Sequence, residues 1–166
     1  MKYAIFEIVE QIADAWGPKY KQLKADEHRS PQLAKFMDLI HNRNIEWIVD
    51  PNIEYTPNNG NMNTLRTKLF QEMDQLYHYT NMTSYPNLPQ EKRNKLWRTT
   101  LEVLHPKDAE LLVNAIRNRH LWDYRLSFEH VKELFPEVSY KWPQPEKSRI
   151  RKKDSQQNDE SSEKEE

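Results

Sequence analysis

The sequence has 166 residues, no cysteine and only two glycines, and its 25 Lys and Arg nearly balance its 26 Asp and Glu. The absence of cysteine excludes disulfides, zinc–thiolate sites, iron–sulfur clusters and cysteine nucleophiles, and it fits a reducing, intracellular setting. Gly17 and Gly60 are too few for the glycine-rich loops that cradle phosphates, so Walker-A and Rossmann nucleotide sites are excluded.

The first sixteen residues predict an amphipathic helix. They carry four charged side chains and therefore lack the apolar core of a signal peptide. No window of the chain is apolar enough to span a membrane, so we expect no membrane association. Gly17-Pro18 predicts the end of this helix, before a short polar segment rich in lysine. The expected inward residues are Ile5, Ile8, Val9, Ile12 and Trp16.

Ser30-Pro31 predicts the start of a second helix, because serine is a good N-cap and proline costs nothing at the first helical position. Its inward face carries Leu33, Phe36, Met37 and Ile40.

Residues 42–63 are rich in turn-forming Asn, Pro and Gly, yet they hold five large apolar side chains. A loop of this composition is expected to pack across the helices, with Trp47 as its anchor and without forming a sheet. The apolar residues are Ile45, Trp47, Ile48, Ile53 and Tyr55.

Four further helices are predicted downstream. The first spans about four turns from Leu65 to Tyr77, Pro89 opens the second, Pro106 opens the third after a very tight corner, and Ser127 caps the fourth. Their expected inward residues are Leu65, Leu69, Met73, Leu76 and Tyr77; Leu96, Trp97, Leu101 and Leu104; Ala109, Leu112, Val113 and Ile116; and Phe128, Val131, Leu134 and Phe135.

These elements predict an all-α fold in residues 1–143, a compact bundle of about six short helices with a long packed loop. After Trp142-Pro143 the apolar residues nearly vanish, and a basic run is followed by an acidic stretch. Such a segment buries too little to offset an ordering entropy of about 1–2 kcal/mol per residue. Residues 144–166 are therefore predicted to be a disordered charged tail.

No stretch carries a catalytic signature, so we assign no catalytic, cofactor-binding or metal-binding residue. His105 and Asp108 could meet for acid/base chemistry, but the favoured interpretation is that His105 caps the helix opened by Pro106 while Asp108 complements its dipole. An enzyme would need a third polar group beside them in a pocket. The six histidines contain no His-x3-His pair, although a cluster formed in three dimensions stays open.

Basic residues favour a contact with nucleic acid or an acidic surface. Rings at Trp122 and Tyr124 follow the cations, as in sites that pair phosphate contacts with base stacking. Residues 1–143 are nevertheless neutral, with 19 Lys and Arg against 19 Asp and Glu, and Glu91 and Glu102 also fit a plain solvated helix face. The candidate contact residues, all expected to be exposed, are Lys92, Arg93, Lys95, Arg98, Arg117 and Arg119, followed by Arg149, Arg151, Lys152 and Lys153 of the tail.

Between Ser30 and Val138 the chain resembles a family of uncharacterised small proteins of T-even-like tailed phages. The resemblance implies a phage origin and a place in the cytoplasm of the infected bacterium, and it carries no catalytic residues. The acidic end of the tail and the tryptophan in the helix after Pro89 depart from the family pattern. The matching motifs are Leu101-Glu102, His105-Pro106-Lys107-Asp108-Ala109-Glu110, Ser30-Pro31, Ile45-Glu46-Trp47, Tyr55-Thr56-Pro57-Asn58, Lys92-Arg93 and Val131 through Phe135-Pro136.

The sequence therefore predicts a non-enzymatic phage accessory protein. It would act by protein–protein contact on replication, recombination or transcription machinery of the infected cell, with DNA or RNA contact left open. The alternative is a virion or assembly component of the tail, baseplate or head, which would equally need no glycine loop, metal or cysteine.

Overall fold

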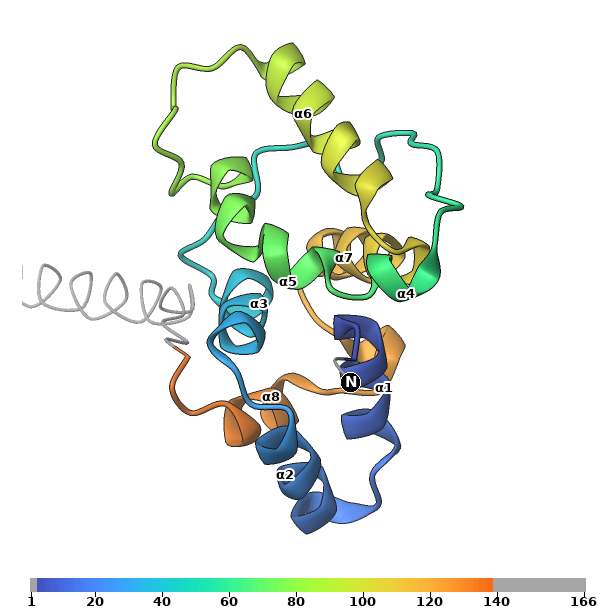
Figure 1. Cartoon of the computed structure of the whole chain (residues 1–166). Coiled ribbons are helices and arrows are strands. Elements are labelled where there is room, and N and C mark those ends of the chain that lie inside the picture. The colour runs from blue at the N-terminus through green and yellow to red at the C-terminus, as the bar shows by residue number, and fades with distance from the viewer. Residues whose placement is uncertain (1–2, 139–166) are drawn as a thin grey trace, which may run out of the picture.

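The computed structural model describes residues 3–138, and this part of the chain is all-α, as the sequence predicts (Figure 1). The predicted tail and its candidate residues Arg149, Arg151, Lys152 and Lys153 lie outside the described residues. The elements are α1 (Ile5–Asp14), α2 (Gly17–Glu27), α3 (Pro31–His41), α4 (Met62–Leu65), α5 (Lys68–Glu72), the 3-10 helix η1 (Met73–Tyr79), α6 (Gln90–Val103), α7 (Pro106–Asn118), the 3-10 helix η2 (Trp122–Tyr124) and α8 (Phe128–Leu134).

One apolar core joins these helices. In Figure 1, α6 lies at one end of the molecule and α2 at the other, with α3 and α7 between them. The largest side chains with no exposed surface are Trp97 of α6, Phe36 of α3 and Phe135 after α8. The core therefore extends from α6 through α3 to the residues after α8. Ser30 and Ser127 cap α3 and α8 as predicted, accepting from Leu33 N at 3.1 Å and His130 N at 3.2 Å. Between residues 3 and 138, no helix is long and apolar enough to cross a membrane.

The loop before α4 packs across the helices, and Trp47 is its anchor as predicted. The Trp47 indole N–H donates to the Leu39 carbonyl at 3.1 Å, and its ring lies 6.0 Å from the ring of Trp97. Trp47 also forms an isolated antiparallel bridge with Thr80, and the described residues contain no longer strand pairing. The loop therefore covers one side of the core instead of projecting into solvent.

Two boundaries differ from the prediction. The lysine-rich segment after Gly17-Pro18 is a helix, α2, which buries only Ala25 and so lacks the apolar periodicity from which helices are recognised. Proline stands here near the start of a helix, a position it favours, and does not end α1. The helix predicted from Leu65 to Tyr77 is divided into α4, α5 and η1, and no feature of the sequence marks the breaks.

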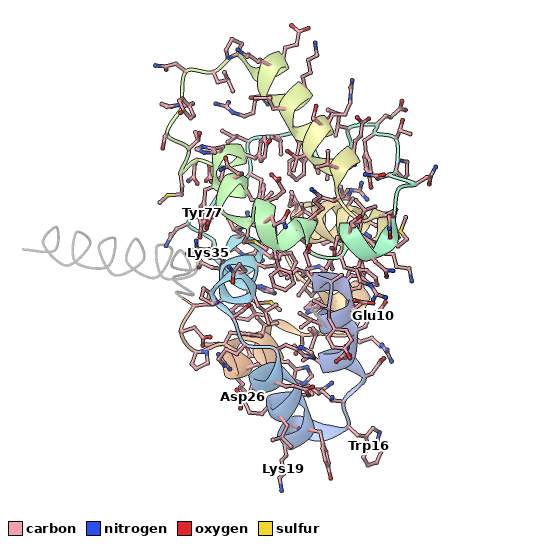
Figure 2. The ribbon with its side chains drawn as sticks, in the orientation of Figure 1. Glu10, Trp16, Lys19, Asp26, Lys35 and Tyr77 are labelled. Carbon is pink, nitrogen blue, oxygen red and sulfur yellow. The ribbon has the colours of Figure 1, made fainter. Side chains whose placement is uncertain are left out.

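Trp16 is not an inward residue of α1. It is the N-cap of α2, with 89% of its surface exposed, and Figure 2 shows it beside Lys19 at the tip of the α1–α2 corner, pointing away from the body. The extended backbone at Ala15 ends α1 before Trp16, so Trp16 does not continue the helical spacing of the inward residues. A large aromatic ring is therefore presented to solvent.

Replacing Trp97 by alanine is expected to destabilise the fold by about 3–5 kcal/mol, because the change leaves a large cavity in the core. Trp122 is the matched control, since its side chain is 62% exposed and Trp122→Ala should stay within about 0.5 kcal/mol of the parent. Urea unfolding of both variants measures the difference, and equal losses would contradict this placement of the two tryptophans.

Candidate functional site

Helix α6 presents the first group of predicted contact residues. Trp97, Leu101 and Leu104 are fully buried, and this inner stripe turns Lys92, Lys95 and Arg98 to the exposed side of the same helix. Within residues 3–138 none of these three cations forms an ion pair. They are exposed as predicted, and their charges are available to a partner.

The exposed side of α6 also carries apolar groups. Leu96, predicted to face inward, is 46% exposed, and Val103 is 38% exposed. The prediction for Leu96 is wrong because the inner stripe is centred on Trp97, so the residue before it lies about 100° away around the helix. We call the exposed residues of this helix the α6 outer face; they are Gln90, Glu91, Lys92, Lys95, Leu96, Arg98, Thr99 and Val103.

Arg93 is not an exposed contact residue. Only 4% of its surface is exposed, and its guanidinium Nη2 donates to the Tyr85 carbonyl at 2.7 Å. Arg93 lies one turn before Trp97, on the inner side of α6, and thereby ties the segment before α6 to the helix. Because Arg93 is buried, we assign it a structural role within the chain and not a role in binding a partner.

Arg119 likewise serves the fold. It follows the last turn of α7 in a left-handed conformation, with a φ of 60°, and its guanidinium donates to the carbonyls of Ile40 at 3.0 Å and Asn42 at 2.8 Å. These carbonyls belong to the end of α3, where helical partners are lacking. Burial lowers the pKa of this guanidinium. Arg119 therefore caps α3 and is not exposed as predicted.

Arg117 is exposed and lines a shallow hollow of about 280 Å³ between α7 and the loop before α4. Glu110 and Tyr55 line the same hollow, and a guanidinium nitrogen of Arg117 lies 3.5 Å from the Pro51 carbonyl oxygen. None of the residues that line this hollow belongs to the α6 outer face. Arg117 is thus exposed as predicted, but it is not grouped with Lys92, Lys95 and Arg98.

His105 and Asp108 stand at the junction of α1 and α7. The His105 Nδ1 accepts from Lys107 N at 3.2 Å, so His105 is the N-cap of α7 as predicted. The fully buried Asp108 lies in the first turn of α7, yet its Oδ1 accepts from Phe6 N of α1 at 2.9 Å, across 102 residues of chain. Its Oδ2 has no hydrogen-bond partner among residues 3–138. Sequence reasoning missed the contact with α1, which no local pattern encodes.

Burial raises the pKa of the Asp108 carboxyl to about 7, the hydrogen bond from Phe6 N opposes this, and the nearby Glu7 carboxylate adds to it. Burial also lowers the pKa of the fully buried His41 to about 4, and the His41 Nδ1 lies 2.9 Å from the Met37 carbonyl oxygen that it bonds. Asp108 is therefore mainly neutral below about pH 7 and His41 mainly neutral above about pH 4, so both are uncharged between these values.

The two tryptophans in the basic regions have different roles. Trp97 has no exposed surface and belongs to the core. Trp122 is 62% exposed, and its ring is stacked on that of His120 with 4.6 Å between centroids. Only Trp122 is placed to meet a partner. Among the residues that the structure describes, no three His, Asp or Glu side chains gather as metal ligands would.

Comparisons of the chain with protein-family models, curated proteins and solved structures find no match.

Replacing Asp108 by asparagine is expected to remove a pH-dependent loss of stability. The folded carboxyl, with a pKa of about 7, keeps its proton where the unfolded one, with an ordinary value of 3.8, releases it. Unfolding thus becomes easier as pH rises from about 4 to 7, by at most about 1.4 kcal/mol per pH unit. The stability of Asp108→Asn relative to the parent should therefore rise over this interval and level off above it.

Urea unfolding across a pH series measures this difference. Asp26→Asn is the control, because hydrogen bonds from Gln22 and Arg29 lower the pKa of the exposed Asp26, so its difference from the parent should change only in acid. A pH-independent difference for Asp108→Asn would contradict the raised pKa.

Arg119→Ala is expected to cost about 1–3 kcal/mol of stability, because the carbonyls at the end of α3 lose their guanidinium donor. Arg117→Ala, two residues earlier and exposed, should change stability by less than about 0.5 kcal/mol. Thermal or urea unfolding of the pair tests this, and an Arg119 variant as stable as the Arg117 variant would contradict the capping role.

Proposed function

We propose that this chain is a non-enzymatic phage accessory protein that acts in the infected bacterial cell by contacting another protein through the α6 outer face. The observation that carries the proposal is the composition of that face. Unpaired Lys92, Lys95 and Arg98 stand beside exposed Leu96 and Val103 on one helix at one end of the molecule (Figure 1). The phage setting comes from the family resemblance, and replication, recombination or transcription machinery is the expected class of partner.

The mixture of cations and apolar groups favours a protein over bare phosphate. Leu96 and Val103 share one side of α6, seven residues or two turns apart, and such side chains gain by leaving water against an apolar surface. Phosphates offer no such surface, whereas an acidic protein patch with an apolar centre would satisfy both kinds of group. Nucleic-acid binding through the same cations remains the competing outcome of the test below.

The geometry of His105 and Asp108 supports a non-enzymatic role. The His105 Nδ1 accepts a backbone N–H, and the one hydrogen bond of Asp108 within residues 3–138 also comes from a backbone N–H. Neither side chain lines the hollow at Arg117. The two groups are used to join helices, which agrees with the capping interpretation of the sequence.

The test is an affinity pull-down of the tagged full chain from infected cells, read by mass spectrometry at low and high salt, with and without nuclease. Lys92→Glu/Leu96→Ser/Arg98→Glu should lose the partner, because it removes both the charge and an apolar contact. The control Lys107→Glu/Lys132→Glu changes two exposed lysines elsewhere and should retain the partner. Circular dichroism checks that each variant is folded.

Nuclease-resistant recovery of replication, recombination or transcription subunits, lost only in the α6 variant, is the expected result. Loss of all partners on nuclease treatment would replace the proposal with nucleic-acid binding. Recovery of capsid, tail or baseplate proteins alone would make the chain a particle component.

A further inference from the structure

Helix α2 carries an apolar seam that nothing in residues 3–138 covers. Trp16, Tyr20 and Leu23 are 89%, 59% and 56% exposed, and they are spaced by four and three residues. This spacing continues to Glu27, so the four side chains follow one side of α2 along its whole length. We call the three apolar residues Trp16, Tyr20 and Leu23 the α2 seam.

The seam lies far from the α6 outer face. Figure 1 shows α2 at the opposite end of the molecule from α6, and Figure 2 shows Trp16 and Lys19 projecting from the α1–α2 tip. Singly exposed apolar residues are ordinary, but an aligned Trp, Tyr and Leu are typical of a helix that packs against another helix. We therefore expect the α2 seam to have a binding partner of its own.

We propose that the occupant is a second copy of this chain, with the two α2 helices packed antiparallel about a two-fold axis. The argument is the charge beside the seam. Lys19 and Asp26 are seven residues apart and flank the seam on the same side, one near each end of α2. A two-fold axis across an antiparallel pair brings the same flank of both helices together, so each Lys19 meets the Asp26 of the other copy.

Both charges are available for this contact. Lys19 forms no ion pair or hydrogen bond within residues 3–138. Asp26 is exposed and forms an ion pair with Arg29 of its own chain at 3.0 Å; this contact and the bond from Gln22 at 2.9 Å both end on Oδ1, so the Oδ2 atom is the one left for a second cation. The other flank of the seam carries Gly17 and Lys24, where the two Lys24 side chains approach each other, and each is paired with Glu27 of its own helix at 3.0 Å, which offsets its charge.

The area agrees with a weak, concentration-dependent dimer. Aromatic side chains bury about 150–250 Å² each when fully covered, so the exposed parts of Trp16, Tyr20 and Leu23 and their flanks amount to roughly 1,000 Å² over two copies. This is near the lower limit for a specific interface. Such a dimer would present its two α6 outer faces away from the shared α2 helices.

Charge exchange between copies gives the sharpest test. Lys19→Asp alone and Asp26→Lys alone each place like charges opposite each other twice in a homodimer, so each is expected to be monomeric. Their equimolar mixture restores two opposite-charge pairs per heterodimer, so the mixture should associate as the parent does. Sedimentation velocity on the full chain over a concentration series measures the mass, which should rise from 20.1 kDa toward twice that value in the parent and in the mixture.

Two further comparisons locate the interface. Trp16→Ser should abolish association, whereas Trp122→Ser, which removes another exposed tryptophan from η2, should leave it unchanged. Circular dichroism shows whether the variants are folded, and Trp16 is too exposed for its loss to affect the core. Parent protein that stays at the mass of one chain at every concentration, a mixture no more associated than its components, or association that survives Trp16→Ser would each overturn the proposal.

The inference stands apart from the α6 contact. Lys92→Glu/Leu96→Ser/Arg98→Glu should leave the mass of the dimer unchanged, and loss of the protein partner in the pull-down would not affect the sedimentation result. Failure of one proposal is therefore distinguishable from failure of the other.

Discussion

The hydrogen bond from Phe6 N to Asp108 is the contact on which the arrangement of this chain depends. Alanine stands at the N-cap of α1, where a side-chain oxygen is usual, so the first turn of this helix needs acceptors from elsewhere. Glu7 satisfies Ala4 N at 2.7 Å, and Asp108 satisfies Phe6 N from the start of α7. One buried carboxyl thereby fixes the starts of two helices against each other, with the Phe6 and His105 rings in contact at 4.8 Å between centroids.

Polar side chains also bind backbone carbonyls elsewhere, both at helix ends and in the segment before α6. Arg119 closes the end of α3, Arg93 holds the carbonyl of Tyr85 before α6, and Lys21 donates to the carbonyls of Ile12 and Ala13 at the end of α1. Because the fold has many short helices, many backbone groups at helix ends lack hydrogen-bond partners within their own helix. Long cationic side chains donate hydrogen bonds to some of the carbonyls among them. Several charges that resemble binding residues in the sequence are used in this way.

Two of the exposed surfaces lie at opposite ends of the molecule (Figure 1). The α6 outer face combines cations with Leu96 and Val103, while α2 presents an aromatic seam whose flanking charges complement themselves. A cationic face suits an acidic partner, and a self-complementary one suits another copy of the chain. If both proposals hold, self-association through α2 and partner contact through α6 would occur without competition, because the two helices lie at opposite ends of the molecule.

The sequence alone determined the elements that local physics encodes. Proline and serine at Ser30-Pro31, Pro106 and Ser127 set helix starts, apolar periodicity set the inner faces of α1, α3 and α7, and the rings of Trp47 and Tyr55 indicated a packed loop. It missed α2, because a helix that buries one residue has no periodic signal. Only the tertiary structure decided that Trp97 is core and Trp16 is exposed, that Arg93 and Arg119 face backbone carbonyls, and that Asp108 serves α1. Each of these outcomes depends on groups distant in the sequence being brought into contact, which no local pattern contains.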